Sequence, residues 1–276
     1  MKKKLIVSVI SCLFCFCVNA QSYKNNFIKA LNANDMVKAE EILKAWDMAD
    51  SNSPDLFIAY FNYYTIMSKN ALPLIVTGYD STYSKKALEF ISEGIVRFPT
   101  RFDMRIAKLS MLRELKKYPD YVSEILQVIA YSRKIENNWK GEDYVILDYA
   151  EDMLFGAVLE VQEVLFSRND PSLYKDIIRI SEEMLKYYPK HARSLLACST
   201  VYIAQKDLDK SLEALKKAIA LEPTNAIFLY NMAYVYKTKG DKVNAKKYYE
   251  LTITHSKEQE EKIKENAIKH LNDLRN

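Results

Sequence analysis

Apolar side chains near the C-terminus recur at intervals of three and four residues, which places them on one face of an α-helix. Within residues 192–225 one such stripe is followed by a short polar turn at Lys206-Asp207 and by a second stripe that stops near Pro223. The first stripe consists of Leu195, Cys198, Ser199 and Tyr202, and the second of Ser211, Leu215, Ala218 and Ile219. The pattern predicts two antiparallel helices that approach closely at their small residues.

The same pattern returns 34 residues later, in residues 226–256. Matched positions are Leu195 with Leu229, Tyr202 with Tyr236, Asp207 with Asp241, Ser211 with Ala245 and Ile219 with Ile253. A fixed period of this size is typical of solenoids, in which each helix pair buries its apolar face only against its neighbours. The small–large alternation on this period resembles the tetratricopeptide repeat. The resemblance implies an all-α, right-handed α-solenoid of stacked antiparallel helix pairs.

Upstream, the second-helix pattern recurs in less regular form. Ala87, Ile91, Gly94 and Pro99 have the spacing of Ser211, Leu215, Ala218 and Pro223, and Ala39, Leu43 and Trp46 follow it again after Asp35. Pro189 lies 34 residues before Pro223 and closes a helix that begins near Pro171. We therefore predict five to six helix pairs in one solenoid domain, residues 21–276, with degenerate repeats over residues 22–191.

Two departures from the pattern lie in the middle of the chain. Tyr118-Pro119-Asp120 replaces the usual turn, and the helix expected from Tyr144 to Phe166 is longer than a repeat helix. At the C-terminal end, residues 257–276 carry one apolar stripe and charge elsewhere, and Ser256–Gln259 fits a capping box. We expect a capping helix that seals the last repeat. The alternative is an amphipathic helix that binds a partner.

The N-terminus predicts a targeting segment. Three lysines precede an uncharged apolar run from Leu5 to Val18, and Val18-Asn19-Ala20 supplies small residues for cleavage before Gln21. We expect residues 1–20 to be a secretory signal peptide, which makes the mature protein secreted across the inner membrane and periplasmic. Two alternatives remain open: an uncleaved anchor, and a lipoprotein acylated at Cys12, because Val9-Ile10-Ser11-Cys12 resembles a bacterial lipobox.

Composition narrows the class of function. The chain has 40 Lys and Arg against 36 Asp and Glu, and Lys2, Lys3 and Lys4 belong to the targeting segment, so the remainder is close to neutral. It therefore lacks the basic field of a nucleic-acid binder. Of its four cysteines only Cys198 follows the signal, on the apolar face of a repeat helix, which excludes a disulfide within one mature chain.

The resemblance also implies where a partner would bind. Ligand peptides of tetratricopeptide proteins generally lie in a concave groove lined by the first helix of each repeat. Carried to this sequence by position, the groove face comprises Arg193, Leu196, Thr200, Ile203, Ile227, Tyr230, Asn231, Tyr234 and Lys237. Its apolar and basic side chains suit a peptide with some acidic character. No matched lysine pair accompanies Asn231, so a carboxylate clamp is not expected.

Two connections are longer than the solenoid needs. The apolar segment Ala71–Tyr83 is expected either to fold back over the solenoid edge or to bind, because long loops are often functional. Asn137–Asp143 contains Trp139, which we interpret as a packing anchor.

Motifs for chemistry are absent from the sequence. The three histidines are scattered without metal-ligand spacing, and no phosphate-binding or nucleophile motif occurs. We expect no enzyme activity, metal or cofactor. The sequence predicts a non-enzymatic interaction scaffold of the cell envelope that binds a peptide or protein of unknown identity. The alternative is a membrane-surface or lipoprotein accessory factor in envelope assembly or transport.

Overall fold

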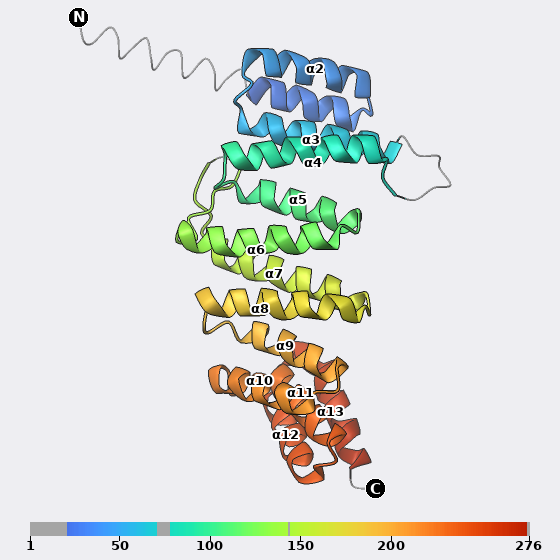
Figure 1. Cartoon of the computed structure of the whole chain (residues 1–276), viewed down its shortest axis with the longest axis vertical. Coiled ribbons are helices and arrows are strands. Elements are labelled where there is room, and N and C mark those ends of the chain that lie inside the picture. Colours follow the sequence, from blue (N-terminus) through green and yellow to red (C-terminus); the bar gives the residue numbers. More distant parts are fainter. Residues whose placement is uncertain (1–20, 71–77, 143, 275–276) are drawn as a thin grey trace, which may run out of the picture. The chain divides into compact units, whose positions relative to one another are not determined.

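The computed structural model describes residues 21–70, 78–142 and 144–274. The predicted signal peptide and most of the apolar segment 71–83 lie outside these ranges, so both remain predictions. Within the described residues, regular secondary structure is helical apart from two isolated β-bridges (Figure 1). This confirms the all-α class expected from the sequence.

The helices follow one another as antiparallel pairs. A helical segment over residues 21–32 comes first. It is followed by α2 (Met36–Ala49), α3 (Pro54–Asn70), α4 (Ser81–Arg97), α5 (Phe102–Glu114), α6 (Tyr118–Lys134), α7 (Ala150–Ser167), α8 (Tyr174–Tyr187), α9 (Ala192–Ala204), α10 (Leu208–Leu221), α11 (Ala226–Thr238), α12 (Lys242–His255) and α13 (Glu261–Asp273), with short 3₁₀ turns at Pro171–Leu173 and Glu258–Glu260. Over the described ranges this gives six pairs and a terminal helix.

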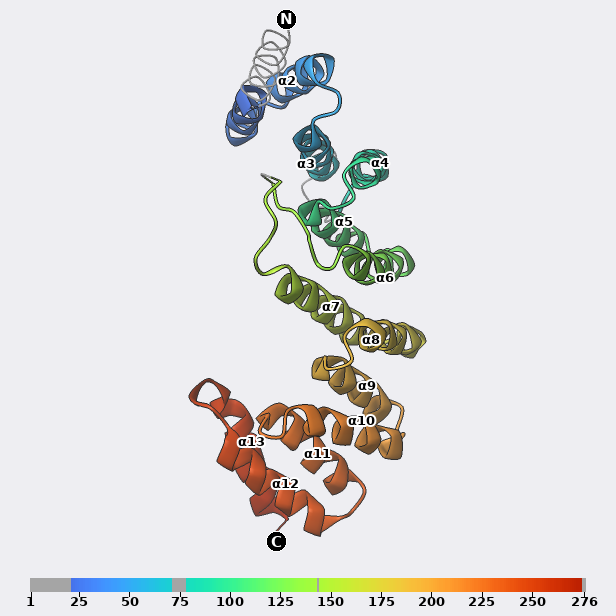
Figure 2. The same ribbon diagram turned by 90° about the vertical axis from the view of Figure 1, so that its left-hand side faces the viewer.

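The chain forms two compact units. The first holds the chain up to Tyr121 together with Ile135–Ala150, and the second holds Val122–Lys134 together with the chain from Glu151 onward. In the first unit α3 packs against α2 and α4, and α4 also packs against α5. In the second unit each helix from α8 to α13 packs against the next (Figure 2). Each unit is therefore a stack of neighbouring helix pairs.

A recurring turn explains why the pairs form where they do. Asp35, Asp207 and Asp241 each precede a second helix, and each carboxylate accepts a hydrogen bond from the backbone N–H three residues later, at 2.9, 3.2 and 3.0 Å. The residue before each aspartate is in the left-handed region, with φ of 55°, 63° and 82°. The turn reverses the chain, and the aspartate then caps the exposed amides of the new helix.

The buried face of each second helix matches the sequence pattern. Ala39, Leu43 and Trp46 of α2 are fully buried, as are Leu215 and Ala218 of α10. Cys198 is a free, buried thiol on α9. The small and large positions predicted from the 34-residue period therefore form the seams between helices.

The middle of the chain differs from the prediction. The helix expected from Tyr144 begins only at Ala150 and extends to Ser167, because the described residues before it form bends, turns and an isolated bridge, and Tyr144 lies in the left-handed region with a φ of 59°. Lys140 forms a parallel bridge with Arg101 and an antiparallel bridge with Ile146. The Lys140 amide donates to the Thr100 carbonyl at 2.8 Å and the Phe102 amide donates to the Lys140 carbonyl at 3.1 Å, and these two bonds hold the α6–α7 connection beside α5 (Figure 2). Trp139 is fully buried there, which confirms it as a packing anchor.

Two local expectations were also wrong by a few residues. Tyr118-Pro119-Asp120 does not form the turn but begins α6. A proline is tolerated there because amides in the first turn of a helix have no hydrogen-bond acceptor within the helix. At the last helix, Ser256 donates back to the carbonyl of Thr252 at 2.7 Å, and the Glu260 carboxylate accepts instead from the Lys257 amide at 2.9 Å. The cap therefore begins one residue later than the predicted box.

Candidate functional site

A cleft in the second unit lies between the first helices of two successive pairs, α7 and α9. Its larger part has a volume of about 790 Å³ and its smaller part about 240 Å³. Leu159 and Arg193 line both parts, so the two parts adjoin each other. The α7 residues that line it are Glu151, Asp152, Phe155, Gly156, Leu159, Gln162, Glu163, Phe166 and Ser167. Most follow the three- and four-residue spacing of one helix face.

The smaller part is a mainly apolar recess. Phe166 of α7, Ile177 of α8 and Leu196 of α9 contribute to its lining. Gln162 is buried at this place and donates from Nε2 to the Ser181 Oγ at 2.8 Å. Because its amide is already hydrogen-bonded within the protein, the recess offers an occupant apolar surface in preference to polar partners.

The larger part is bordered by charged and aromatic side chains. The connection between α8 and α9 contributes Tyr188, Lys190 and His191. The His191 ring lies 4.4 Å from that of Phe155, and its Nδ1 is 2.8 Å from the Ser194 Oγ. Burial, and then the charge of Arg193, lower the pKa of His191 to about 4. This histidine is therefore neutral at physiological pH.

The structure separates the nine predicted groove residues into three groups. Arg193, Leu196 and Thr200 line the recess of the cleft. Ile203 and Ile227 are partly buried and pack against the cores around Leu212 and Phe228. These two isoleucines therefore contribute to the seams between helices, as Leu196 also does in part.

The remaining four lie on α11, where the terminal helix covers part of the face. The Tyr230 ring lies 6.2 Å from that of His270 on α13. The Lys237 Nζ lies 2.9 Å from the His270 Nδ1 and 3.4 Å from an Asp273 carboxylate oxygen. Asn231 donates to the Ile227 carbonyl at 2.8 Å, and Tyr234 remains 39% exposed. Helix α13 thus occupies surface that the repeat pattern assigned to a groove.

Replacing Tyr230 with alanine should destabilise the second unit by about 1 kcal/mol, because its ring packs between Tyr249 and α13. The exposed Tyr234, one helical turn away, is the matched control, and Tyr234→Ala should change the free energy of unfolding by less than about 0.5 kcal/mol. Urea unfolding followed by far-ultraviolet circular dichroism measures both. Equal losses in the free energy of unfolding would show that the contact between Tyr230 and α13 contributes no more to stability than the exposed ring of Tyr234.

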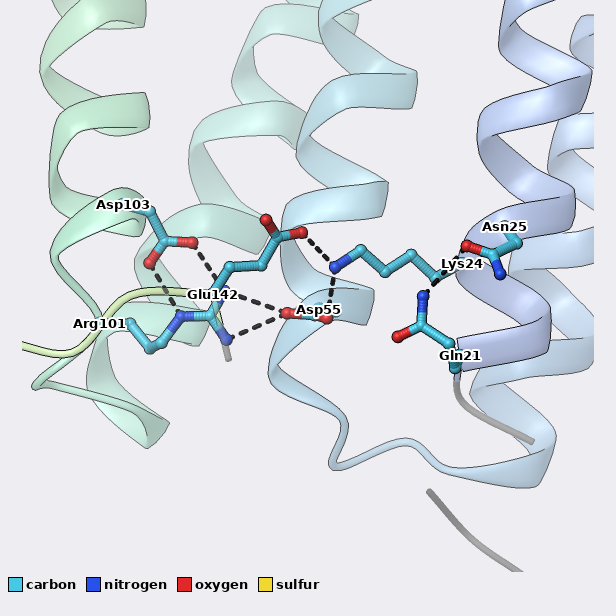
Figure 3. Close-up of polar contacts among 7 residues, drawn as sticks. All are labelled: Gln21, Lys24, Asn25, Asp55, Arg101, Asp103 and Glu142. Carbon is cyan, nitrogen blue, oxygen red and sulfur yellow. Dashed lines mark hydrogen bonds and ion pairs between the residues drawn. The ribbon is translucent and has the colours of Figure 1, made fainter. Parts of the chain in front are cut away.

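A second cluster, in the first unit, was not predicted. The Arg101 side chain is fully buried and lies between two carboxylates (Figure 3). Its Nε and Nη2 donate to the two oxygens of Asp103 at 2.8 and 2.6 Å, and Nη1 and Nη2 donate to one oxygen of Asp55 at 3.0 Å. Lys24 donates to the other Asp55 oxygen at 3.0 Å and pairs with Glu142. We call these five residues the ionic cluster.

The ionic cluster joins parts of the first unit that are far apart in sequence. Lys24 belongs to helical residues 21–32, Asp55 and Asp103 lie in the first turns of α3 and α5, and Glu142 belongs to the α6–α7 connection. Burial alone lowers the pKa of Arg101, but hydrogen bonds and charge from Asp103 and Asp55 reverse this, so the pKa is raised. The guanidinium therefore remains charged. Its ion pairs, together with those of Lys24, link these segments of the first unit to one another.

The described residues offer little for metal or membrane chemistry. Within them, no three His, Cys, Asp or Glu side chains gather closely enough to share a metal ion. None of the helices in these ranges combines the length and apolarity needed to span a bilayer.

The fold and cleft define an α-solenoid repeat protein built from helix–turn–helix pairs. A family model described as a TPR repeat matches residues 200–240, from the end of α9 through α11. On this match and on the 34-residue spacing of its helix pairs, the C-terminal part of the chain is built from tetratricopeptide repeats. No curated protein matches it.

Solved structures with similar chains share little sequence with it. A tetratricopeptide repeat protein from Parabacteroides merdae is 14% identical, with 92% of this chain and 93% of that chain covered and a TM-score of 0.42. YrrB, described as a TPR protein with an unusual peptide-binding site, is 11% identical, with 82% and 97% covered and a TM-score of 0.45. The TPR2AB domain of yeast Sti1, in complex with an HSP90 peptide, is 12% identical, with 93% and 97% covered and a TM-score of 0.33.

Proposed function

We propose that this protein is a non-enzymatic scaffold of the cell envelope that binds a segment of a partner protein in the cleft between α7 and α9. The observation that carries the proposal is the cleft itself. It follows the first-helix face of consecutive pairs, and Arg193, Leu196 and Thr200, selected from sequence for this role, line it.

The properties of the cleft support a peptide as occupant. Two adjoining parts along one face of α7 suit an elongated ligand, and an apolar recess with a few polar groups at its border is typical of binding sites. Phe155, Phe166 and Tyr188 line it and are partly buried, so they retain surface for a partner. Aromatic side chains of this kind contribute strongly to protein interfaces.

The envelope location rests on the N-terminal sequence. A basic start, an apolar run and small residues before Gln21 support export to the periplasm. The alternative, a membrane-surface accessory factor, is favoured by the lipobox-like sequence that ends at Cys12. Intact-mass analysis of the mature chain separates them, since a start at Gln21 supports the soluble scaffold and an acylated Cys12 supports the accessory factor.

Filling the cleft should abolish partner capture. Gly156 lines its larger part, and a Cβ added there meets no atom within 4 Å, so Gly156→Trp places an indole in the cleft without a clash at the Cβ. We expect crosslinked affinity capture from native envelopes, read by mass spectrometry, to enrich a partner with the natural chain and to lose it with this variant.

The matched control is Val243→Trp, which adds the same side chain at an 81%-exposed position of α12 outside the cleft. Capture should be unchanged with this variant. A partner retained by both variants would show that binding occurs elsewhere and would overturn the proposed cleft.

A further inference from the structure

The charges around the cleft are unequal on its two walls. The α7 wall presents the carboxylates of Glu151, Asp152 and Glu163, and the residues of α7 that line the cleft include no lysine or arginine. The opposite wall contributes Lys190 and Arg193, with Glu222 beside them. His191 adds no charge at physiological pH, because its pKa is about 4. The lining of the cleft therefore includes four carboxylates and two cations, and three of the carboxylates lie on the α7 wall.

Two of the α7 carboxylates are available to an incoming ligand. Asp152 and Glu163 are exposed and, among the described residues, form no ion pair or hydrogen bond with another side chain. They line different parts of the cleft, Asp152 the larger part and Glu163 the recess. A cationic partner group would meet each of them without first displacing a cation that belongs to the protein.

The spacing of these carboxylates sets a length for the ligand. Asp152 and Glu163 are eleven residues apart on one helix, which corresponds to about 17 Å along its axis. An extended peptide covers that distance in about five residues. Leu159 and Leu196, which line the recess, provide an apolar position within this span.

We propose that the cleft binds an extended segment that carries an apolar side chain in the recess and lysine or arginine residues, about five positions apart, against Asp152 and Glu163. This rests on the proposed function and adds the chemistry of its partner. It also reverses the acidic preference expected from sequence, because Lys237 is engaged by α13 and the acidic α7 wall was not recognised as part of the groove.

An array of short peptides of random sequence, probed with the labelled mature protein, tests the preference. We expect the bound peptides to be enriched in lysine and arginine beside leucine or phenylalanine. Glu163→Lys should weaken binding of these peptides about fivefold or more, since it replaces attraction by repulsion. Glu182→Lys makes the same charge change at an exposed position of α8 outside the cleft and should leave binding unchanged.

The cleft-filled Gly156→Trp variant separates two questions: whether the cleft is the binding site, and whether it prefers basic peptides. If the bound peptides are acidic and are lost with this variant, the cleft is a binding site but the basic preference is wrong. If no peptide depends on the cleft, both the preference and the proposed function fail. Equal weakening by Glu163→Lys and Glu182→Lys would show an unspecific effect of net charge and would also overturn the preference.

Discussion

Replacing Arg101 with methionine should lower the free energy of unfolding of the first unit by about 3–5 kcal/mol. The guanidinium is fully buried and is the cation between Asp55 and Asp103. Methionine has a similar length but no charge, so both carboxylates would lose their hydrogen bonds, with only Lys24 left beside Asp55. The loss follows from uncompensated carboxylate charge more than from lost packing.

Tryptophan fluorescence during urea unfolding measures this effect selectively, because the only two tryptophans, Trp46 and Trp139, both belong to the first unit. Arg97→Met is the matched control. Arg97 makes its ion pair with Glu93 on the exposed face of α4 at 2.6 Å, and such surface pairs contribute no more than about 1 kcal/mol. Similar losses for the two variants would show that the ionic cluster does not stabilise the first unit beyond an ordinary surface pair.

The repeat architecture could be predicted because its determinants are local. The aspartate before each second helix caps an amide only three residues away, and the small Ser199 of α9 meets Ser211 of α10, in the same pair, with their Oγ atoms 2.7 Å apart. The spacing of these positions remains recognisable in the sequence even where the repeats are degenerate, as Ala39 and Leu43 of α2 show. The terminal helix was recognised for the same reason, from its single apolar stripe.

The candidate site was harder to predict because it depends on how elements meet. Position within the repeat identified Arg193 and Leu196, but the facing wall belongs to α7, whose repeat is too degenerate to align. Nothing in the local sequence indicated that α13 would cover Tyr230. The ionic cluster joins Arg101 to Asp55 across 46 residues, and a single sequence offers no signal for such a pairing beyond the adjacent carboxylate of Asp103.

Gly94 provides a test in which the consensus of the repeat and the structure predict opposite results. Its equivalents in the regular repeats are Ala218 and Thr252, so the pattern favours a side chain at this position, and alanine also forms helices better than glycine by about 1 kcal/mol. In the structure, however, α3 approaches α4 so closely that a Cβ on Gly94 would lie 2.8 Å from the Cβ of Phe57. That atom is fixed to the α3 backbone and cannot rotate away.

We therefore expect Gly94→Ala to destabilise the first unit by about 1–3 kcal/mol, the range for overpacking a well-filled seam. Gly156→Ala is the control, because an added Cβ meets no atom there and only the helix propensity changes, so it should stabilise α7 by up to about 1 kcal/mol. Urea unfolding shows whether each variant is less or more stable than the natural chain. It is followed by tryptophan fluorescence for the first variant and by circular dichroism for the second. A stabilising Gly94→Ala would mean that α3 and α4 can separate at little cost, and that the glycine is a degenerate repeat position without a packing requirement.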